Sequence, residues 1–329
     1  MSSLIYVVAA IAVLVLLLAL VYIFYPSLIR RMSSTAHRQP ETDELTRIRH
    51  AEKAEDADKK EKALYNAWLA TQRLRRLQIE ACLPTAIRDG QLTLLYEPQY
   101  ELAGGVLRGV EAQLIFNHPE LGEMPLRDFL RVAESTNMTA QISEWTIRQA
   151  CEAFTRIKAR FPERVLKLTI NVTGSQLESN GFEALVKDTL LATDISPNQL
   201  ELALTEGSSL SSVEAAALQV EALKAIGVRL ALDKFGSTRH STHFLRTLPF
   251  DTIKLVPKHV HDIGSVKERD MTGAMIGFFK HLGYTVVAEG LETYEQLTYL
   301  KKYKCDYAQG RLFGKLLQED ELSVLFLVS

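Results

Sequence analysis

The chain has 329 residues, of which 47% are hydrophobic and 24% are charged, and its formal net charge is −2. This composition is typical of a folded protein, and the near-zero charge offers no basic field for nucleic acid, so we expect no nucleic-acid partner. The three cysteines, Cys82, Cys151 and Cys305, are far apart and in no C-x-x-C spacing. They predict neither a disulfide scaffold nor a cysteine zinc site, and they fit a reducing compartment.

The first feature in chain order is an apolar run at residues 4–25 that contains no charged side chain. As a helix it would span about 33 Å, enough to cross a hydrocarbon core of about 30 Å. No Lys or Arg precedes the run, whereas Arg30, Arg31 and Arg38 follow it. The positive-inside rule therefore places the N-terminus outside and the remainder in the cytoplasm. We expect residues 1–30 to be an uncleaved transmembrane anchor, because a signal peptide would need a basic start and a small-residue cleavage site.

Residues 31–78 form the next predicted segment, a charged linker. Between residues 41 and 62, charges of both signs alternate at helical spacing without a Gly or Pro. This pattern predicts a solvated helix that continues to about residue 77. One interpretation is a spacer that holds the following domain away from a membrane. The other is a dimerising coiled coil, which would make the chain a dimer, but the apolar residues form no sustained heptad seam.

From residue 79 to residue 329, short apolar runs alternate with longer amphipathic segments, the pattern of βαβ units around a largely parallel sheet. Seven or eight such units in roughly 245 residues favour a closed (β/α)8 barrel, an α/β fold, over an open sheet. Helices are expected at residues 143–159, 212–226, 270–282 and 294–303. Strands are expected at residues 92–96, 107–116, 166–171, 200–204, 228–233, 252–255 and 285–289.

Four of the expected strands end in a polar residue: Asn171, Asp233, Lys254 and Glu289. Because the C-terminal ends of barrel strands meet at one mouth, these side chains should converge. A single polar residue at a strand end is most often a helix cap or a turn former. A set of carboxylates with an amide is instead the ligand chemistry of hard divalent cations. A lysine beside such a set could hold a phosphate or orient a water.

At these residues the chain resembles the EAL family, the bacterial cyclic-di-GMP phosphodiesterase domains, over about residues 79–327. The matching blocks follow the family's order and include LLYEPQYEL, GVEAQLIFNHPELG, INVTGSQL, LELALTEG, GVRLALDKFGS, LPFDTIKL, GYTVVAEGLET and CDYAQGRLFGKLL. The resemblance implies a modified (β/α)8 barrel with one antiparallel strand, here in a single-pass protein of the bacterial inner membrane. Active members bind two Mg²⁺ or Mn²⁺ ions and hydrolyse cyclic-di-GMP to linear pGpG.

The resemblance implies roles for individual residues of this chain. Lys254 matches the lysine that helps to position the attacking water, and with Glu289 it would be catalytic. Gln309 matches a late glutamine near the site and is a candidate ligand-binding residue. The positions of the metal site are matched by Glu111, Asn171, Asp233 and Glu289.

Several positions depart from the family pattern. Lys234 stands where the family has the second Asp of an Asp-Asp pair, which the two metals share, and Ala203 replaces a metal-binding Glu. Ile115 replaces an Arg that grips a substrate phosphate, and Glu97 replaces a Gln that lies against the substrate. The motif that names the family has the sequence Glu-Ala-Gln here, with Gln113 in place of Leu.

These departures change the charge of the metal site. Glu111, Asp233 and Glu289 supply −3 and Lys234 adds +1, and the resulting −2 cannot neutralise two divalent cations. Lys234 could pair with these carboxylates, or could meet a phosphate directly as a ligand-binding residue. Without the Arg at position 115, phosphate capture weakens by about 10²-fold or more.

The sequence therefore predicts a membrane-anchored, catalytically degenerate EAL domain that acts as a regulatory protein-interaction module. No cofactor is expected, and the partner is a protein that the sequence does not name. A cyclic-di-GMP receptor is a second form that this module could take, although Ile115 and Glu97 disfavour the nucleotide as a ligand. The alternative is an active phosphodiesterase with an adapted site, which would need Mg²⁺ or Mn²⁺.

Overall fold

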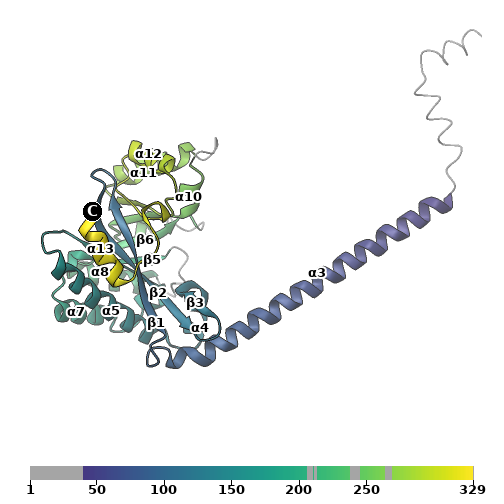
Figure 1. The fold of residues 1–329 in the computed structure, drawn as a ribbon, viewed down its shortest axis with the longest axis horizontal. Coiled ribbons are helices and arrows are strands. Elements are labelled where there is room, and N and C mark those ends of the chain that lie inside the picture. Colours follow the sequence, from purple (N-terminus) through teal and green to yellow (C-terminus); the bar gives the residue numbers. More distant parts are fainter. Residues whose placement is uncertain (1–39, 206–209, 211–212, 238–244, 264–268, 329) are drawn as a thin grey trace, which may run out of the picture. The chain divides into compact units, whose positions relative to one another are not determined.

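The computed structural model describes residues 40–328, except 206–209, 211–212, 238–244 and 264–268 (Figure 1). The chain divides into two compact units, Met1–Arg73 and Leu74–Ser329. The predicted anchor at residues 4–25 lies outside the described residues. Within the part of the chain that the structure describes, no helix combines the length and the apolar character needed to cross a membrane.

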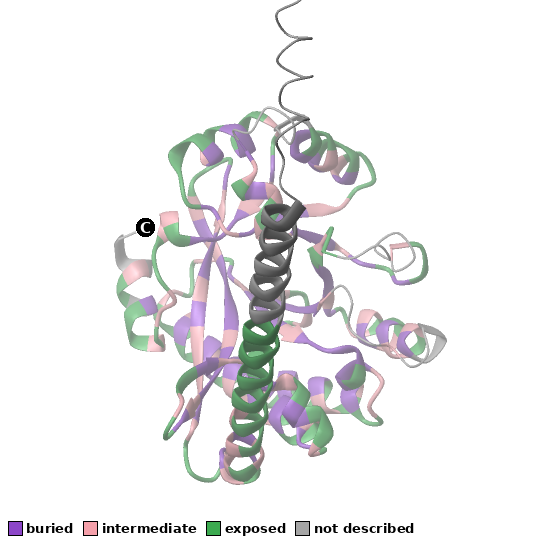
Figure 2. Cartoon of the chain, turned by 90° about the vertical axis from the view of Figure 1, so that its right-hand side faces the viewer, coloured by how far each residue is buried: buried purple, intermediate pink, exposed green. Residues whose placement is uncertain are grey.

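The described residues of the first unit belong to one helix, α3 (Pro40–Cys82), whose last turns lie in the second unit. The helix predicted from the alternating charges is therefore confirmed. Its side chains from residue 59 to residue 73 are exposed and are green in Figure 2. The exposed side chains include Leu64 and Trp68, and the ring of Trp68 stacks on Tyr65 with the ring centroids 6.1 Å apart.

In the second unit, eight strands close into a barrel (Figure 1). The ring runs through β1 (Leu92–Glu101), β9 (Tyr307–Ala308), β8 (Thr285–Ala288), β7 (Thr252–Leu255), β6 (Arg229–Phe235), β5 (Leu200–Thr205), β4 (Lys167–Val172) and β2 (Val106–His118). Strand β1 pairs with β2 to close the ring and is antiparallel to both neighbours, whereas the other pairs in the ring are parallel. The predicted closed barrel is confirmed, and so is its single antiparallel strand.

Helices surround this barrel. The longer ones are α4 (Leu126–Ser135), α5 (Thr139–Arg160), α7 (Phe182–Thr193), α8 (Val213–Ala225), α11 (Arg269–His281), α12 (Tyr294–Lys302) and α13 (Glu319–Val328). Shorter helices are α6 (Gly174–Leu177), α10 (Pro257–His261), η1 (Leu83–Thr85), η2 (Pro197–Gln199) and η3 (Arg311–Phe313). All predicted strands and helices are present, with ends that differ by a few residues. The sequence did not predict β9, or β3 (Gly122–Pro125), which pairs with the far end of β2 outside the ring.

Two hydrophobic clusters form the core of the second unit. The larger cluster lies between the barrel strands and the surrounding helices, where residues such as Leu202 of β5 and Phe154 of α5 are fully buried (purple in Figure 2). The smaller cluster packs the last turns of α3 against β2, β3 and α4 through Ile79, Phe116 and Phe129. The strands that carry the predicted site residues are therefore buried on both faces, which fixes their register.

Candidate functional site

Lys254 of β7 lies among three carboxylates inside the barrel mouth, and its side chain is fully buried. Its Nζ is 2.7 Å from Glu111 Oε2, 2.7 Å from Glu289 Oε1 and 3.4 Å from Asp233 Oδ1. The carboxylates come from β2, from the residue after β8 and from β6, and the parallel register brings them together. A buried ammonium without partners would cost several kcal/mol, so Lys254 depends on these three groups.

Glu111 is the most fully bonded carboxylate of the cluster. Its Oε1 accepts hydrogen bonds from Asn171 Nδ2 at 2.6 Å and from Gln113 Nε2 at 3.0 Å. Its Oε2 accepts from Lys254 Nζ at 2.7 Å and from Gln309 Nε2 at 2.6 Å. The side chains of four residues therefore donate to this one carboxylate, which is almost completely shielded from solvent.

Gln309, the residue after β9, links the cluster to β1. Its Nε2 donates to Glu97 Oε2 at 2.9 Å as well as to Glu111, and it lies 3.5 Å from Glu289 Oε1. Its Oε1 accepts a hydrogen bond from Gln99 Nε2 at 2.7 Å. Because Gln99 donates to the carbonyl end of the amide, the NH₂ end of Gln309 faces the carboxylates.

Burial and neighbouring charges shift the proton affinities of the cluster. Burial alone would lower the pKa of Lys254, but the carboxylates, with Asp233 first, raise that pKa well above its ordinary value. Burial opposes ionisation of Asp233, yet Lys254 and Lys234 hold its pKa below the ordinary value. Burial and the charge of Asp233 raise the pKa of Glu289. Burial and the charge of Glu111 raise the pKa of Glu97 to about 7.

Two of the departures from the family pattern, Lys234 and Ala203, lie on the neighbouring strands β6 and β5. The Lys234 side chain is 46% exposed, and its Nζ lies 3.8 Å from Asp233 Oδ2. Its backbone has a φ of 58°, a left-handed conformation that is costly for a residue other than glycine. Ala203 is fully buried in β5 and lies in register between Asn171 and Ala231. The wall of the mouth at Ala203 therefore presents a methyl group and no oxygen.

The other two departures lie on the first two strands. Ile115 is buried in β2 and lies opposite Thr93 of β1 and Pro125 of β3. It follows Glu111 by four residues, which places both side chains on the same face of the strand. Glu97 lies opposite Glu111 in the pairing of β1 with β2. The mouth therefore gains a carboxylate and an aliphatic side chain where the family pattern has an amide and an arginine.

These side chains do not fit a pair of divalent cations. An ammonium at position 234 repels cations, and the donors to Glu111 already engage both of its oxygens. Among the described residues, no group of three His, Cys, Asp or Glu side chains is arranged to hold a metal ion. Asn171 Oδ1 is buried and has no hydrogen-bond partner among these residues, but one free amide oxygen does not complete a metal site.

The structure brings together all the polar strand ends that the sequence singled out, and Gln309 with them; their roles remain predictions. Sequence reasoning held that Lys234 could pair with Asp233, Glu111 or Glu289. In the described part of the chain, Lys234 pairs only with Asp233, and Lys254 contacts all three. Sequence reasoning also missed Gln99, and it noted Gln113 only as a departure from the naming motif and not as a donor. Their spacing of two residues from Glu97 and Glu111 along a strand was the available signal.

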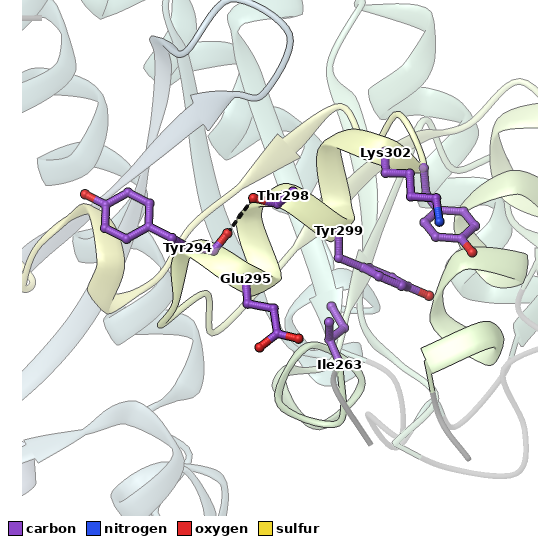
Figure 3. Close-up of a pocket in the computed structure, with 7 residues that line it drawn as sticks. Ile263, Tyr294, Glu295, Thr298, Tyr299 and Lys302 are labelled. Atoms are coloured by element: carbon purple, nitrogen blue, oxygen red, sulfur yellow. Dashed lines mark hydrogen bonds between the residues drawn. The ribbon is translucent and has the colours of Figure 1, made fainter. Parts of the chain in front are cut away.

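A cleft of about 510 Å³ lies away from these residues, along α12. In Figure 3, Glu295 and Tyr299 extend from α12 toward Ile263, whereas Tyr294 points away. None of the predicted site residues lines this cleft, so the barrel mouth remains the candidate site.

Comparisons with known proteins agree with this fold. Residues 80–316 match the EAL domain. An uncharacterized signaling protein of Caulobacter vibrioides is 33% identical over 243 residues, which cover 74% of this chain and 29% of that protein. The cyclic di-GMP phosphodiesterase NbdA of Pseudomonas aeruginosa is 32% identical over 254 residues, which cover 77% of this chain and 32% of that protein. The chain thus spans about a third of the length of these curated relatives.

Among solved structures, the PaMucR phosphodiesterase in complex with c-di-GMP is 28% identical to this chain, with a TM-score of 0.69. The match covers 74% of this chain and 99% of that one.

Proposed function

The chain belongs to the EAL domain family, and from this premise we propose that it is a catalytically inactive member. In this proposal it acts as a regulatory protein-interaction module at the bacterial inner membrane and needs no cofactor. Residues 4–25 tether it as a single-pass anchor, with the N-terminus outside and the barrel in the cytoplasm.

The loss of two metal-site carboxylates, at Ala203 and Lys234, carries this proposal. Two-metal hydrolysis requires carboxylates that are free to bind cations and an anion that bridges the two ions. Here Glu111, Asp233 and Glu289 share a single buried ammonium, that of Lys254. Lys234 and Ala203 remove the two remaining ligands that the family pattern would supply. The geometry supports a mouth whose carboxylates are held together by side chains of the protein.

Cyclic-di-GMP is the first small molecule to test, because relatives of this chain include a named cyclic-di-GMP phosphodiesterase and a solved complex with that nucleotide. Ile115 provides no charge for a phosphate, and Glu97 places a carboxyl group at the same mouth. At the mouth, the partly exposed ammonium of Lys234 could meet a phosphate. We therefore propose a protein as the partner and regard the nucleotide as a disfavoured ligand.

Two measurements on the full-length chain, purified in detergent, test this function. The first measures conversion of cyclic-di-GMP to pGpG with Mg²⁺ or Mn²⁺, and we expect no product. The second titrates cyclic-di-GMP calorimetrically with Mg²⁺ and again with EDTA. Turnover together with Mg²⁺-dependent binding would establish the alternative, an active phosphodiesterase. Binding that persists in EDTA would instead indicate a receptor, and its loss in Lys234→Ala would place the nucleotide at the mouth.

A further inference from the structure

We propose that hydrogen-bond donors of this chain take the place of metal ions at the barrel mouth, and that Gln113 is a positioning residue for this arrangement. The inference rests on the proposed function, because it explains how an EAL barrel without metals keeps its carboxylates together. It goes further, because it assigns a role to the residue that alters the family's naming motif.

Hydrogen-bond donors of the protein occupy both carboxylate oxygens of Glu111. An ionised carboxylate offers roughly four lone-pair sites to donors or cations. Asn171 and Gln113 donate to one oxygen, and Lys254 and Gln309 donate to the other, all at 2.6–3.0 Å. A cation that approached Glu111 would have to displace at least one of these donors. The protein's own donors therefore occupy the oxygen atoms that would otherwise bind a cation.

Gln113 supplies one of these hydrogen bonds to Glu111. It follows Glu111 by two residues on β2, so its side chain lies on the same face of the strand and reaches Glu111 Oε1. A leucine at this position has no N–H group and could make no such bond. Asn171 would then be the only donor to that oxygen among the described residues. The change from Leu to Gln therefore adds a donor next to the oxygen that a metal would otherwise use.

Gln309, another of these donors, is itself held in place by Gln99. Gln99 is fully buried, and its amide donates to Gln309 Oε1 at 2.7 Å. This contact fixes the orientation of the Gln309 amide toward Glu111 and Glu97. The donors thus come from β1, β2, β4, β7 and the end of β9, and they bind the strands of the mouth to one another without an ion.

Thermal unfolding of the full-length chain in detergent, in EDTA and in Mn²⁺, tests this arrangement. We expect the wild-type midpoint to be the same in both conditions. Gln113→Leu and Gln113→Met should each lower the midpoint by about 2–4 °C, because both remove the donor from a carboxylate. Gln113→Met keeps a long unbranched side chain, so a wild-type midpoint in that variant would overturn the role of the donor.

The decisive readout is Mn²⁺ affinity, which a merely structural role of Gln113 would not change. Ala203→Glu with Lys234→Asp restores two carboxylates and should give measurable Mn²⁺ binding. Adding Gln113→Leu to this pair should raise the affinity about tenfold, because the cation then no longer has to displace the hydrogen bond from Gln113 to Glu111 Oε1. Gln149→Leu, which removes an amide on α5, is the matched control and should leave the affinity unchanged.

The outcomes separate the two proposals. Hydrolysis of cyclic-di-GMP by the wild type, or destabilisation of the wild type by EDTA, would overturn the proposed function. An inactive wild type that is insensitive to EDTA, combined with an affinity that Gln113→Leu leaves unchanged, would overturn only the role of Gln113. If the variant with restored carboxylates does not fold, the comparison of Gln113→Met with the wild type still decides the question.

Discussion

At the scale of single residues, Lys254 is the side chain on which the mouth most depends. Lys254→Met fills a similar volume but leaves Glu111, Asp233 and Glu289 without their shared cation. Breaking a buried ion pair from one side typically costs about 3–5 kcal/mol, so we expect a loss of this size in the free energy of unfolding. Urea denaturation measures it. Lys258→Met, on the exposed side of α10, is the control and should change stability by less than about 0.5 kcal/mol.

A second buried charge lies deeper in the barrel, at Glu201 of β5. Its carboxylate accepts from Lys167 Nζ at 2.8 Å and from Thr252 Oγ1 at 2.6 Å. Burial alone would raise the pKa of Glu201, but Lys167 and these hydrogen bonds lower it. The folded-state pKa therefore lies below the unfolded value of about 4.3. The stability that Glu201 contributes is complete above the unfolded value and is lost as the pH falls through the folded one.

Urea denaturation of the wild type and of Glu201→Gln between pH 7 and pH 3 tests this linkage. The wild type should be more stable by the largest margin at pH 7, and the margin should shrink below about pH 4.5. Glu134→Gln, at an exposed position on α4, is the matched control, because it makes the same change of side chain outside the core. A margin that stays constant with pH would mean that the Glu201 carboxyl group titrates alike in the folded and unfolded chain.

At the scale of elements, the last turns of α3 belong to the core of the second unit. Backbone N–H groups of Glu120 and Leu121 both donate to His118 Nδ1 at 3.1 Å. The proton of the neutral ring is therefore on Nε2, which donates to the backbone oxygen of Gln78 at 3.2 Å. His118 lies on β2, the strand that carries Glu111, so the end of α3 is fixed to a strand of the candidate site.

Two leucine-sized positions on this part of α3 allow a matched test. Ile79 is 2% exposed and Leu77 is 52% exposed. Ile79→Ala should cost about 2–5 kcal/mol because it leaves a cavity against Phe116 and its neighbours. Leu77→Ala should cost less than about 0.5 kcal/mol. Equal losses in the two variants, measured by denaturation of the second unit, would contradict the docking of α3 on β2.

Most strands of the barrel could be predicted from the sequence, and two features of the sheet could not. The strands were predictable because each is a short apolar run that is buried on both faces, as in Leu200–Thr205. Strand β3 was missed because its sequence, Gly122–Pro125, has little β propensity and forms by pairing with the end of β2. The end of β1 was misplaced because Pro98 and Gln99 interrupt the apolar run, although both pair with β2. Such pairings depend on the partner strand and not on the local pattern.

For the candidate site, the sequence predicted which side chains lie together at the barrel mouth. It did not predict which of them contact one another. Parallel strands of a closed barrel must bring Asn171, Asp233, Lys254 and Glu289 to one mouth, whichever side chains they carry. Which cation neutralises the carboxylates depends on the depth of each side chain. Lys254 is fully buried at the centre, whereas Lys234 reaches only Asp233 from the rim. Spacing along the sequence contains no information about this depth.

At the scale of the whole molecule, the remaining question is what the first 39 residues do. The proposed anchor is the only uncharged run of its length in the sequence. Basic residues lie on its C-terminal side and none lies on its N-terminal side. If it tethers the chain, removal of residues 1–39 should move the protein from the membrane fraction to the supernatant of a cell lysate. The second unit has its own hydrophobic clusters, so the truncated chain should unfold at the midpoint of the full-length protein.

The orientation can be tested on the same full-length chain. A tag after Ser329 should resist protease added to intact spheroplasts and should be cleaved once the membrane is opened, because the positive-inside rule keeps Arg30, Arg31 and Arg38 in the cytoplasm. A tag that is cleaved in intact spheroplasts would place the barrel outside. A truncated chain that remains with the membrane would show that another part of the protein binds there, and the exposed Leu64 and Trp68 of α3 would then be the first side chains to replace.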